Sequence, residues 1–202
     1  MVSTMPSGDK ARIAIFASGG GSNADKICAF FGSHTDISVD LIVSNKIAAG
    51  VLKVADHHGI ESVYISKKYW HHPEIILPVL ESSDITHIVL AGFLSQIPDW
   101  LISVYHGRII NIHPALLPRH GGKGMYGHHV HEAVKSSAEL ISGITVHEVN
   151  NHYDEGKVIF RKEVELNTED TPEEIARKVL QVEHLYYPQV IEGWIKSQNG
   201  QP

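Results

Sequence analysis

The sequence has little cysteine and no long apolar run. Cys28 is the single cysteine among 202 residues, which excludes an internal disulfide and fits a reducing compartment. The longest apolar stretch, residues 88–94, is far shorter than the roughly 20 residues that a membrane-spanning helix needs. Residues 1–10 lack the apolar segment of a secretory signal, and we expect a disordered N-terminal segment there. These absences favour a cytoplasmic protein without a membrane partner.

Positive charge is also scarce. Lys and Arg together number 17 against 23 Asp and Glu, giving a formal net charge of −6. A general nucleic-acid binder needs an excess of basic side chains to neutralise phosphates, so we expect no nucleic-acid partner. The 15 histidines include those at 128, 129 and 131, but no carboxylate or thiolate completes a ligand spacing, so we expect no metal. The length suits a single domain over residues 11–196, followed by a flexible tail at 197–202.

Short apolar runs alternate with helical patterns along the first half of the chain. The patterns predict strands at 12–17, 37–43, 62–65, 85–92 and 108–113, and helices at 23–31, up to residue 58, at 73–82 and at 99–105. This alternation predicts a Rossmann-like α/β fold with three layers, in which helices cover both faces of a mostly parallel sheet. After a helix at 128–137, residues 144–149 and 158–165 alternate as antiparallel strands do. The C-terminal strands are therefore expected to be antiparallel.

The last helix has the clearest start signal. Thr171 suits the N-cap, Pro172 the first helical position, and Glu174 the residue that reaches back to the cap. Pro188 lies inside the same helical pattern and is expected to bend or split the helix.

The stretch SGGGSN at 18–23 joins the first strand to its helix. Bare backbone N–H groups and the helix dipole favour an anion at such a junction, so the stretch predicts a phosphate site; a tight turn is the alternative. Residues 19–24 also fit a loose dinucleotide pattern. However, Asp40 lies inside the second strand, and not at the carboxyl end where a ribose would bind, which speaks against a nicotinamide cofactor.

Asn111 and His113 are polar residues inside the apolar fifth strand. Because they are two residues apart, they share a face near the strand's carboxyl end, where open α/β sheets place ligands, and Pro114 ends the pairing. An amide and an imidazole suit a carbonyl that becomes a tetrahedral oxyanion. Glu183 lies at the border of the last helix's apolar stripe, where a carboxylate needs a partner, either a structural base or a ligand amine.

Six stretches together resemble one family. They are SGGGSN (18–23), VSNK (43–46), VLAGF (89–93), GRIINIHPALLP (107–118), SGITVHEVNNHYDEGKVI (142–159) and EHLYYP (183–188). In this order they resemble the folate-dependent phosphoribosylglycinamide formyltransferases over nearly the whole chain. The resemblance implies the formyltransferase fold. It also implies transfer of a formyl group from the co-substrate 10-formyltetrahydrofolate to the amine of glycinamide ribonucleotide, in de novo purine biosynthesis, by a monomer or homodimer.

The resemblance also implies residue roles. His113 would be the general acid/base, Asn111 the oxyanion partner, and Asp154 the carboxylate that orients His113, favours its protonated form and helps a water relay the proton. Ribose and phosphate would be held by Gly20, Gly21, Ser22 and Asn23, and the substrate amine by Glu183. The folate would be bound by Leu94, Ser95, Gln96, Ile97, Asn111, Asn150, Asn151 and Tyr153.

The chain departs from the family pattern in two places. Ser95 and Gln96 stand where the family commonly has an arginine, so Lys67 or Lys68 is the candidate to meet the folate's glutamate tail. The loop at 119–127 is also longer than usual, and we expect it to fold over the active site.

Other functions remain as alternatives. Relatives that share the NIHPALLP motif include methionyl-tRNA and nucleotide-sugar formyltransferases and formyltetrahydrofolate hydrolase. We expect a tRNA enzyme to carry a further basic domain and a hydrolase an N-terminal regulatory domain. A non-catalytic nucleotide-binding module would keep the glycine loop but has no need for Asn111, His113 and Asp154 together.

Overall fold

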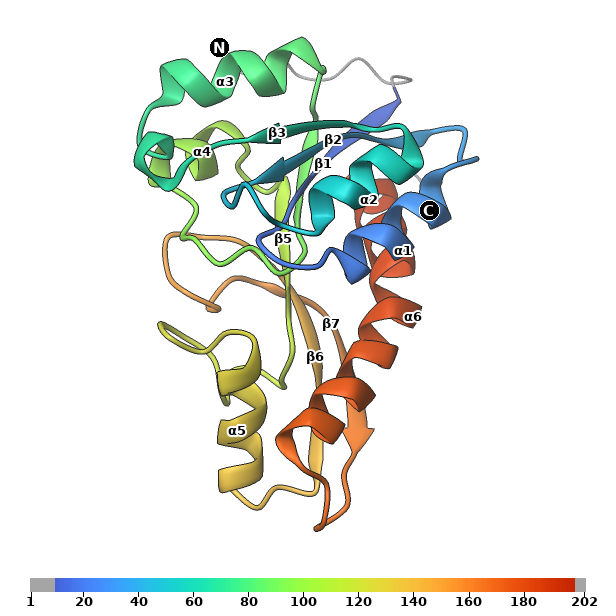
Figure 1. The fold of residues 1–202 in the computed structure, drawn as a ribbon, viewed down its shortest axis with the longest axis vertical. Coiled ribbons are helices and arrows are strands. Elements are labelled where there is room, and N and C mark those ends of the chain that lie inside the picture. Colours follow the sequence, from blue (N-terminus) through green and yellow to red (C-terminus); the bar gives the residue numbers. More distant parts are fainter. Residues whose placement is uncertain (1–9, 199–202) are drawn as a thin grey trace.

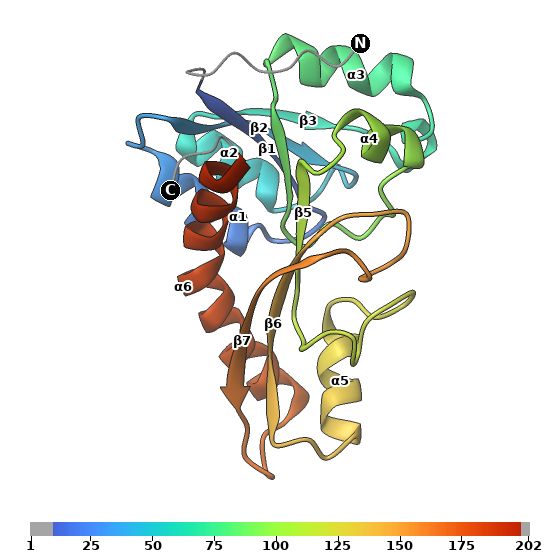
Figure 2. The same ribbon diagram turned by 180° about the vertical axis from the view of Figure 1, so that it is seen from behind.

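The computed structural model describes residues 10–198 and contains one mixed sheet with helices on both faces (Figures 1 and 2). The seven strands follow the order β3-β2-β1-β4-β5-β6-β7. Strands β1 to β5 are parallel, whereas β6 runs antiparallel to β5 and β7 antiparallel to β6. The predicted fold class is therefore confirmed. The expected disordered segment and tail lie mostly outside the described residues, although residues 197 and 198 belong to the last helix.

The elements have the following bounds. The strands are β1 (Ala11–Phe16), β2 (Ile37–Ser44), β3 (Glu61–Tyr64), β4 (His87–Leu90), β5 (Ile109–His113), β6 (Ile141–Glu148) and β7 (Val158–Glu165). The helices are α1 (Ser22–Phe31), α2 (Val51–His58), the 3₁₀ helix η1 (Lys67–Tyr69), α3 (Pro73–Ser82), α4 (Asp99–Val104), α5 (His128–Ser136) and α6 (Pro172–Gln198).

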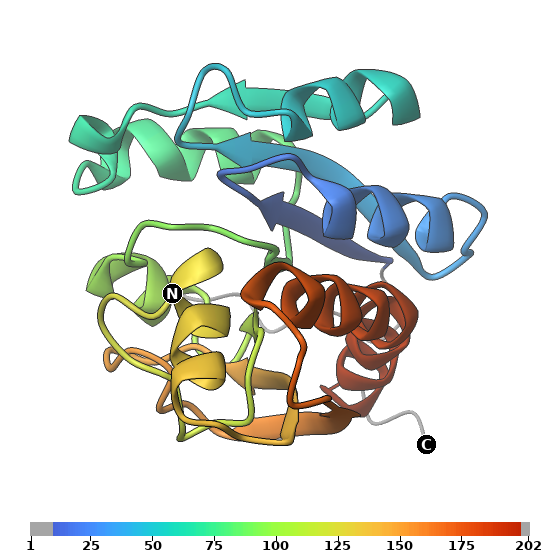
Figure 3. The same cartoon turned by 60° about the horizontal axis from the view of Figure 1, so that its bottom comes forward.

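Strand β1 shows how the sheet is covered on both faces. Ile13 and Ile15 pack in one apolar cluster with α1, α2 and α6, whereas Ala14 and Phe16 pack in a second cluster with α3 and α4. Successive side chains of a strand point to opposite faces, so a strand that is covered on both sides must be apolar throughout. Helix α5 lies beside α6, below the parallel part of the sheet (Figure 3).

Helix α6 begins with the predicted capping box. The backbone N–H of Thr171 donates to the Glu174 carboxylate at 2.9 Å, and the N–H of Glu174 donates to the Thr171 hydroxyl at 3.3 Å. The helix then continues through Pro188 to Gln198, so of the two expected outcomes, a bend or a split, Pro188 does not produce the split. Tyr187, Pro188 and Ile191 are buried, and this packing holds the helix together across the hydrogen bond that proline cannot make.

The fold positions a site where the strand order reverses. Strands β2 and β4 lie on either side of β1, so the loops that leave β1 and β4 diverge at the sheet's carboxyl edge, and open α/β sheets bind ligands in that crevice. Within residues 10–198, no helix is both long and apolar enough to cross a membrane.

Candidate active site

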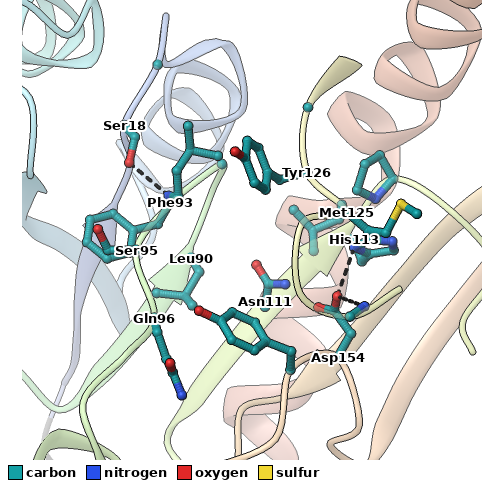
Figure 4. A pocket seen from close by; sticks show the side chains of 18 of the residues that line it. Ser18, Leu90, Phe93, Ser95, Gln96, Asn111, His113, Met125, Tyr126 and Asp154 are labelled. Carbon is teal, nitrogen blue, oxygen red and sulfur yellow. Dashed lines mark hydrogen bonds and ion pairs between the residues drawn. The ribbon is translucent and has the colours of Figure 1, made fainter. Parts of the chain in front are cut away.

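A cavity of about 830 Å³ lies at this carboxyl edge. Its walls come from the β1 and β4 ends, the segment 92–97, β5, the 122–128 segment, the β6–β7 loop and one side of α6. Asn111 lies between the Leu90 and Gln96 side and the His113 and Asp154 side, and Tyr126 extends over it (Figure 4). The structure thus brings residues that are far apart in the sequence into one space.

Strand β5 places Asn111 and His113 on the cavity face, as their spacing predicted. Their cross-strand neighbours on β6 are His147 and Thr145, respectively. The His113 side chain is only 4% exposed. Its Nε2–H donates to the backbone carbonyl of His120 at 2.8 Å. Because a carbonyl only accepts, a neutral His113 carries its proton on Nε2, and Nδ1 is the nitrogen that gains or loses a proton.

Asp154 faces the Nδ1 atom of His113. Its Oδ2 lies 3.6 Å from that nitrogen and accepts a hydrogen bond of 2.8 Å from the Gly122 N–H. Burial acts to raise the pKa of the carboxyl, but the neighbouring imidazoles of His147 and His113 and the Gly122 N–H outweigh it and lower the pKa below its usual value. Asp154 also has a φ of 57°, in the left-handed region that few non-glycine residues adopt. A tight backbone turn therefore aims this carboxylate.

The protonation of His113 is balanced between opposing effects. Burial lowers its pKa, while the Asp154 carboxylate and the His120 carbonyl act in the other direction, and the net pKa is below the usual value. An imidazole in such a balance can accept and return a proton in one reaction cycle.

A second carboxylate also lines the cavity. Glu183 of α6 is 7% exposed, and its Oε2 accepts a hydrogen bond of 2.6 Å from Nδ2 of Asn23. Burial raises the pKa of Glu183 to about 7, against the smaller opposing effect of that hydrogen bond. Within the described chain no basic side chain forms an ion pair with Glu183, so a ligand that carries a cationic amine would supply the missing charge.

The glycine loop is shaped partly by packing. Gly21 has a φ of 85°, and a Cβ there would lie 2.7 Å from Cα of Val51. Of the stretch 18–23, Ser18, Gly19 and Asn23 line the cavity, whereas Gly20, Gly21 and Ser22 are not among its lining residues. No side chain of the described residues caps the N-terminus of α1, whose first N–H groups are free to bind an anion.

The expected folate residues fall into two groups. The cavity is lined by Leu94, Ser95, Gln96, Ile97, Asn111, Asn150 and Tyr153 but not by Asn151. Ser95 accepts a hydrogen bond of 2.7 Å from Asn45, which ties the segment to the end of β2. Lys67 and Lys68 lie on η1, away from the cavity, so neither is placed to meet a ligand tail there; the lysines that line it are Lys46 and Lys123.

Two buried histidines of the cavity were not given a site role from the sequence. His147 of β6 contacts both Asn111 and Asp154, and its position follows from the β5–β6 register, which no local pattern reveals. His131 of α5 is buried, which lowers its pKa to about 4. The sequence drew attention to it only as one of three histidines, at 128, 129 and 131, that could suggest a metal. In the described part of the chain no three His, Cys, Asp or Glu side chains form a metal-binding group.

The fold and the site define a class. This is a Rossmann-like α/β protein that holds an imidazole, an amide and a carboxylate around a space suited to acyl transfer at a carbonyl. A profile of the formyl transferase family matches residues 11–191. The chain therefore belongs to the formyl transferase family.

Named relatives agree with this assignment. The chain is similar to the chloroplastic phosphoribosylglycinamide formyltransferase of Arabidopsis thaliana, with 39% identity over 90% of this chain and 64% of that protein. It is 35% identical to the Bacillus subtilis phosphoribosylglycinamide formyltransferase, over 90% of this chain and 93% of the other. The crystal structure of phosphoribosylglycinamide formyltransferase from Anaplasma phagocytophilum superposes with a TM-score of 0.83 at 31% identity, covering 91% and 85% of the two chains. The chain thus spans slightly less than two thirds of the length of the plant relative.

Proposed function

We propose that the chain transfers the formyl group of 10-formyltetrahydrofolate to the amine of N1-(5-phospho-D-ribosyl)glycinamide. The products are formylglycinamide ribonucleotide and tetrahydrofolate, and the reaction is a step of de novo purine (IMP) biosynthesis. One observation carries the proposal: a single cavity is lined by Asn111, His113 and Asp154 and also by Glu183, a buried carboxylate with no ion-pair partner among the described residues. The names of the relatives support the same choice of substrates.

The proposed chemistry begins with the glycyl amine, which attacks the formyl carbon. A C–N bond forms, and the formyl oxygen becomes an oxyanion. The amide of Asn111 has a second N–H free for this oxygen, and protonated His113 donates from Nδ1. Collapse of the intermediate breaks the bond to N10 of the folate. As the intermediate collapses, His113 gives its Nδ1 proton to N10, and a water held by Asp154 returns to His113 the proton that the amine loses.

The proposed subsites follow the cavity. The backbone of Gly20, Gly21, Ser22 and Asn23 would hold the ribose phosphate at the start of α1. Glu183, which lines the same cavity, would bind the amine. The folate would lie along the segment 94–97 and the β6–β7 loop, where Asn150 and Tyr153 line the cavity. Asn151 lies outside this lining and is left out of the proposed folate site.

The proposed surroundings are those of a cytoplasmic enzyme of small molecules. The single, buried thiol of Cys28 supports a reducing compartment. The net charge of −6 supports small-molecule substrates over nucleic acid, and we propose a monomer or homodimer, which sedimentation of the purified chain would distinguish.

The test mixes the purified chain with 10-formyltetrahydrofolate and glycinamide ribonucleotide, and follows formylglycinamide ribonucleotide by mass spectrometry. Parallel reactions contain no acceptor, an amino sugar nucleotide, or methionyl-tRNA. We expect product only with glycinamide ribonucleotide. Release of formate without an acceptor would establish a hydrolase, and product with another acceptor would overturn the proposed substrate.

A further inference from the structure

His147 joins two of the proposed catalytic residues. It lies on β6 directly opposite Asn111 of β5, and its side chain is 3% exposed. The Nε2 atom of His147 lies 3.2 Å from Nδ2 of Asn111 and 3.5 Å from Oδ1 of Asp154. Neither the composition of β6 nor its alternation of side chains assigns this residue a role.

Backbone carbonyls fix the neutral tautomers of the two imidazoles. The Nδ1–H of His147 donates to the carbonyl of Glu148 at 2.8 Å, as the Nε2–H of His113 donates to the carbonyl of His120. Each ring therefore has one nitrogen left to take a proton, Nε2 in His147 and Nδ1 in His113. These two nitrogens face different oxygens of the same carboxylate, Oδ1 and Oδ2 of Asp154.

One negative charge thus lies between two basic nitrogens, and it can fully compensate only one imidazolium. The charge of either ring lowers the affinity of the other for a proton, and His147 is among the groups that lower the pKa of His113. The hydrogen bond with Asn111 makes the two rings differ, because the lone pair of Nε2 in His147 accepts the Nδ2–H of Asn111. A nitrogen that accepts this bond is not available for a proton.

We propose that His147 is a positioning residue, kept neutral by Asn111, that orients the Asn111 amide and leaves the Asp154 carboxylate to the proton on His113. With Nδ2 held by His147, the remaining N–H of Asn111 is directed toward the reacting oxygen. The oxyanion donor and the proton donor are thereby set by one hydrogen-bond chain. The catalytic part of this inference rests on the proposed function, whereas the tautomers and the site of protonation do not.

Few other titratable groups lie around the hydrogen-bonded residues Asn111, His147 and Asp154. His120 lies in the loop before α5 and His131 on α5, and both interact with His113 through their charges. Asp154 comes from the β6–β7 loop. A test of the proposal must therefore distinguish the ring signals of His147 from those of three other histidines. Single substitutions allow each signal to be assigned.

The first experiment reads the tautomers directly. Chain labelled with ¹⁵N-histidine is titrated between about pH 5 and 8, where imidazoles change charge, and ring signals are assigned with His147→Gln and His113→Gln. We expect His147 to stay in its neutral Nδ1–H form while His113 gains a proton at Nδ1. In Asn111→Leu, which lacks the donor, we expect His147 to take a proton at Nε2. Protonation of His147 ahead of His113 in the unaltered chain would overturn the proposal, as would an unchanged His147 in Asn111→Leu.

The second experiment uses a matched pair of substitutions. His147→Gln keeps an acceptor near the position of Nε2, whereas His147→Asn keeps only the donor to Glu148. Because a misplaced group can cost about 10²-fold in rate, we expect kcat to fall between about 10- and 100-fold in His147→Asn, with KM nearly unchanged, and to recover largely in His147→Gln. His129→Gln, an exposed residue of α5, is the control. Equal losses in both variants, or a loss confined to KM, would overturn the positioning role.

The two experiments separate the proposals. Absence of turnover in the unaltered chain would contradict the proposed function, but the ring titration needs no turnover and still decides the tautomers. Thermal unfolding of each variant shows whether it is folded. If a variant does not fold, the ring titration of the unaltered protein still tests the proposal.

Discussion

The cavity is lined by two carboxylates, Asp154 and Glu183. Burial acts to raise the pKa of both, but their neighbours act on the pKa differently. Asp154 lies between two imidazoles and a backbone N–H, and its pKa is lowered. Glu183 has a single neutral donor, Asn23, and burial raises its pKa to about 7. The comparison teaches that burial alone does not decide the charge of an acid; the cations and donors around it do. The surroundings of Asp154 keep it negative, whereas those of Glu183 favour the negative form only when a cation binds beside it.

The largest expected effect comes from removing the charge of Asp154, which lies beside the two imidazoles. Asp154→Asn keeps the shape and a hydrogen-bond acceptor but no longer favours a proton on His113. General acid–base catalysis contributes about 10²–10⁴-fold, so we expect kcat to fall by about 10³-fold while the fold is retained. Steady-state kinetics and circular dichroism measure both quantities. His113→Ala should have a similar effect, and near-normal turnover in either variant would remove that residue from the mechanism.

Removing the charge of Glu183 is expected to weaken substrate binding. Glu183→Gln removes the negative charge that would meet the substrate amine, and hydrogen bonds to charged groups contribute about 1.5–3 kcal/mol. We expect KM for glycinamide ribonucleotide to rise about 10- to 100-fold, with KM for the folate unchanged. Kinetics with each substrate varied in turn check this difference. An equal rise in both KM values would mean that the substitution disturbs the cavity as a whole.

The comparison also predicts how stability depends on pH. The pKa of Glu183 rises on folding from its ordinary value of 4.5 to about 7, so folding favours the protonated form. The cost of burying the carboxyl is absent below pH 4.5, grows between pH 4.5 and 7, where only the unfolded chain ionises, and is complete above pH 7. Glu183→Gln avoids this cost, and it should gain about 3 kcal/mol of unfolding free energy relative to the unaltered chain between the two limits. Urea unfolding at about pH 5 and 8 measures it, and a pH-independent difference would contradict the raised pKa.

The thiol of Cys28 is a third buried group, and neighbouring groups do little to oppose the effect of burial on its pKa. Cys28 lies on α1 within the apolar cluster, and burial raises its pKa to about 12. The thiolate is the reactive form, so we expect almost no labelling by a thiol reagent in the native state and rapid labelling in urea. Mass spectrometry follows the modification. Fast labelling of the folded chain would show that α1 opens locally, and the glycine loop that precedes it would then be a mobile anion site.

The sequence predicted the elements well where apolar pattern and pairing coincide. The helix at 73–82 and the strand at 158–165 agree with α3 and β7 residue for residue. The fourth strand was predicted at 85–92 but spans only His87–Leu90, because Ile85 and Ala91 are buried without continuing the strand. Conversely, β6 begins three residues earlier than predicted, at the exposed Ile141, which pairs with Glu165 of β7. Apolarity reports burial, whereas strand limits depend on a partner elsewhere in the chain.

The site shows the same division. The spacing of Asn111 and His113 places them on one face without further information, and the start of α6 follows from three local residues. Asp154 required the family resemblance, because a polar turn has many ordinary explanations. His147 escaped both, since its role depends on which residue of β5 it faces. A residue whose function arises from strand register has no local signature.

The antiparallel pairing of β5 and β6 has a consequence for how this family can diversify. The pairs Asn111 with His147 and Ile112 with Val146 are set by hydrogen bonds between the strands, not by the length of the chain between them. Residues can therefore be added or removed at 123–127 without shifting the strand pairing, whereas His120 and Gly122 of the same loop must stay in place to hold His113 and Asp154. Such a loop can adapt to new acceptors while the chemistry is inherited unchanged, which makes it the natural place to engineer substrate choice.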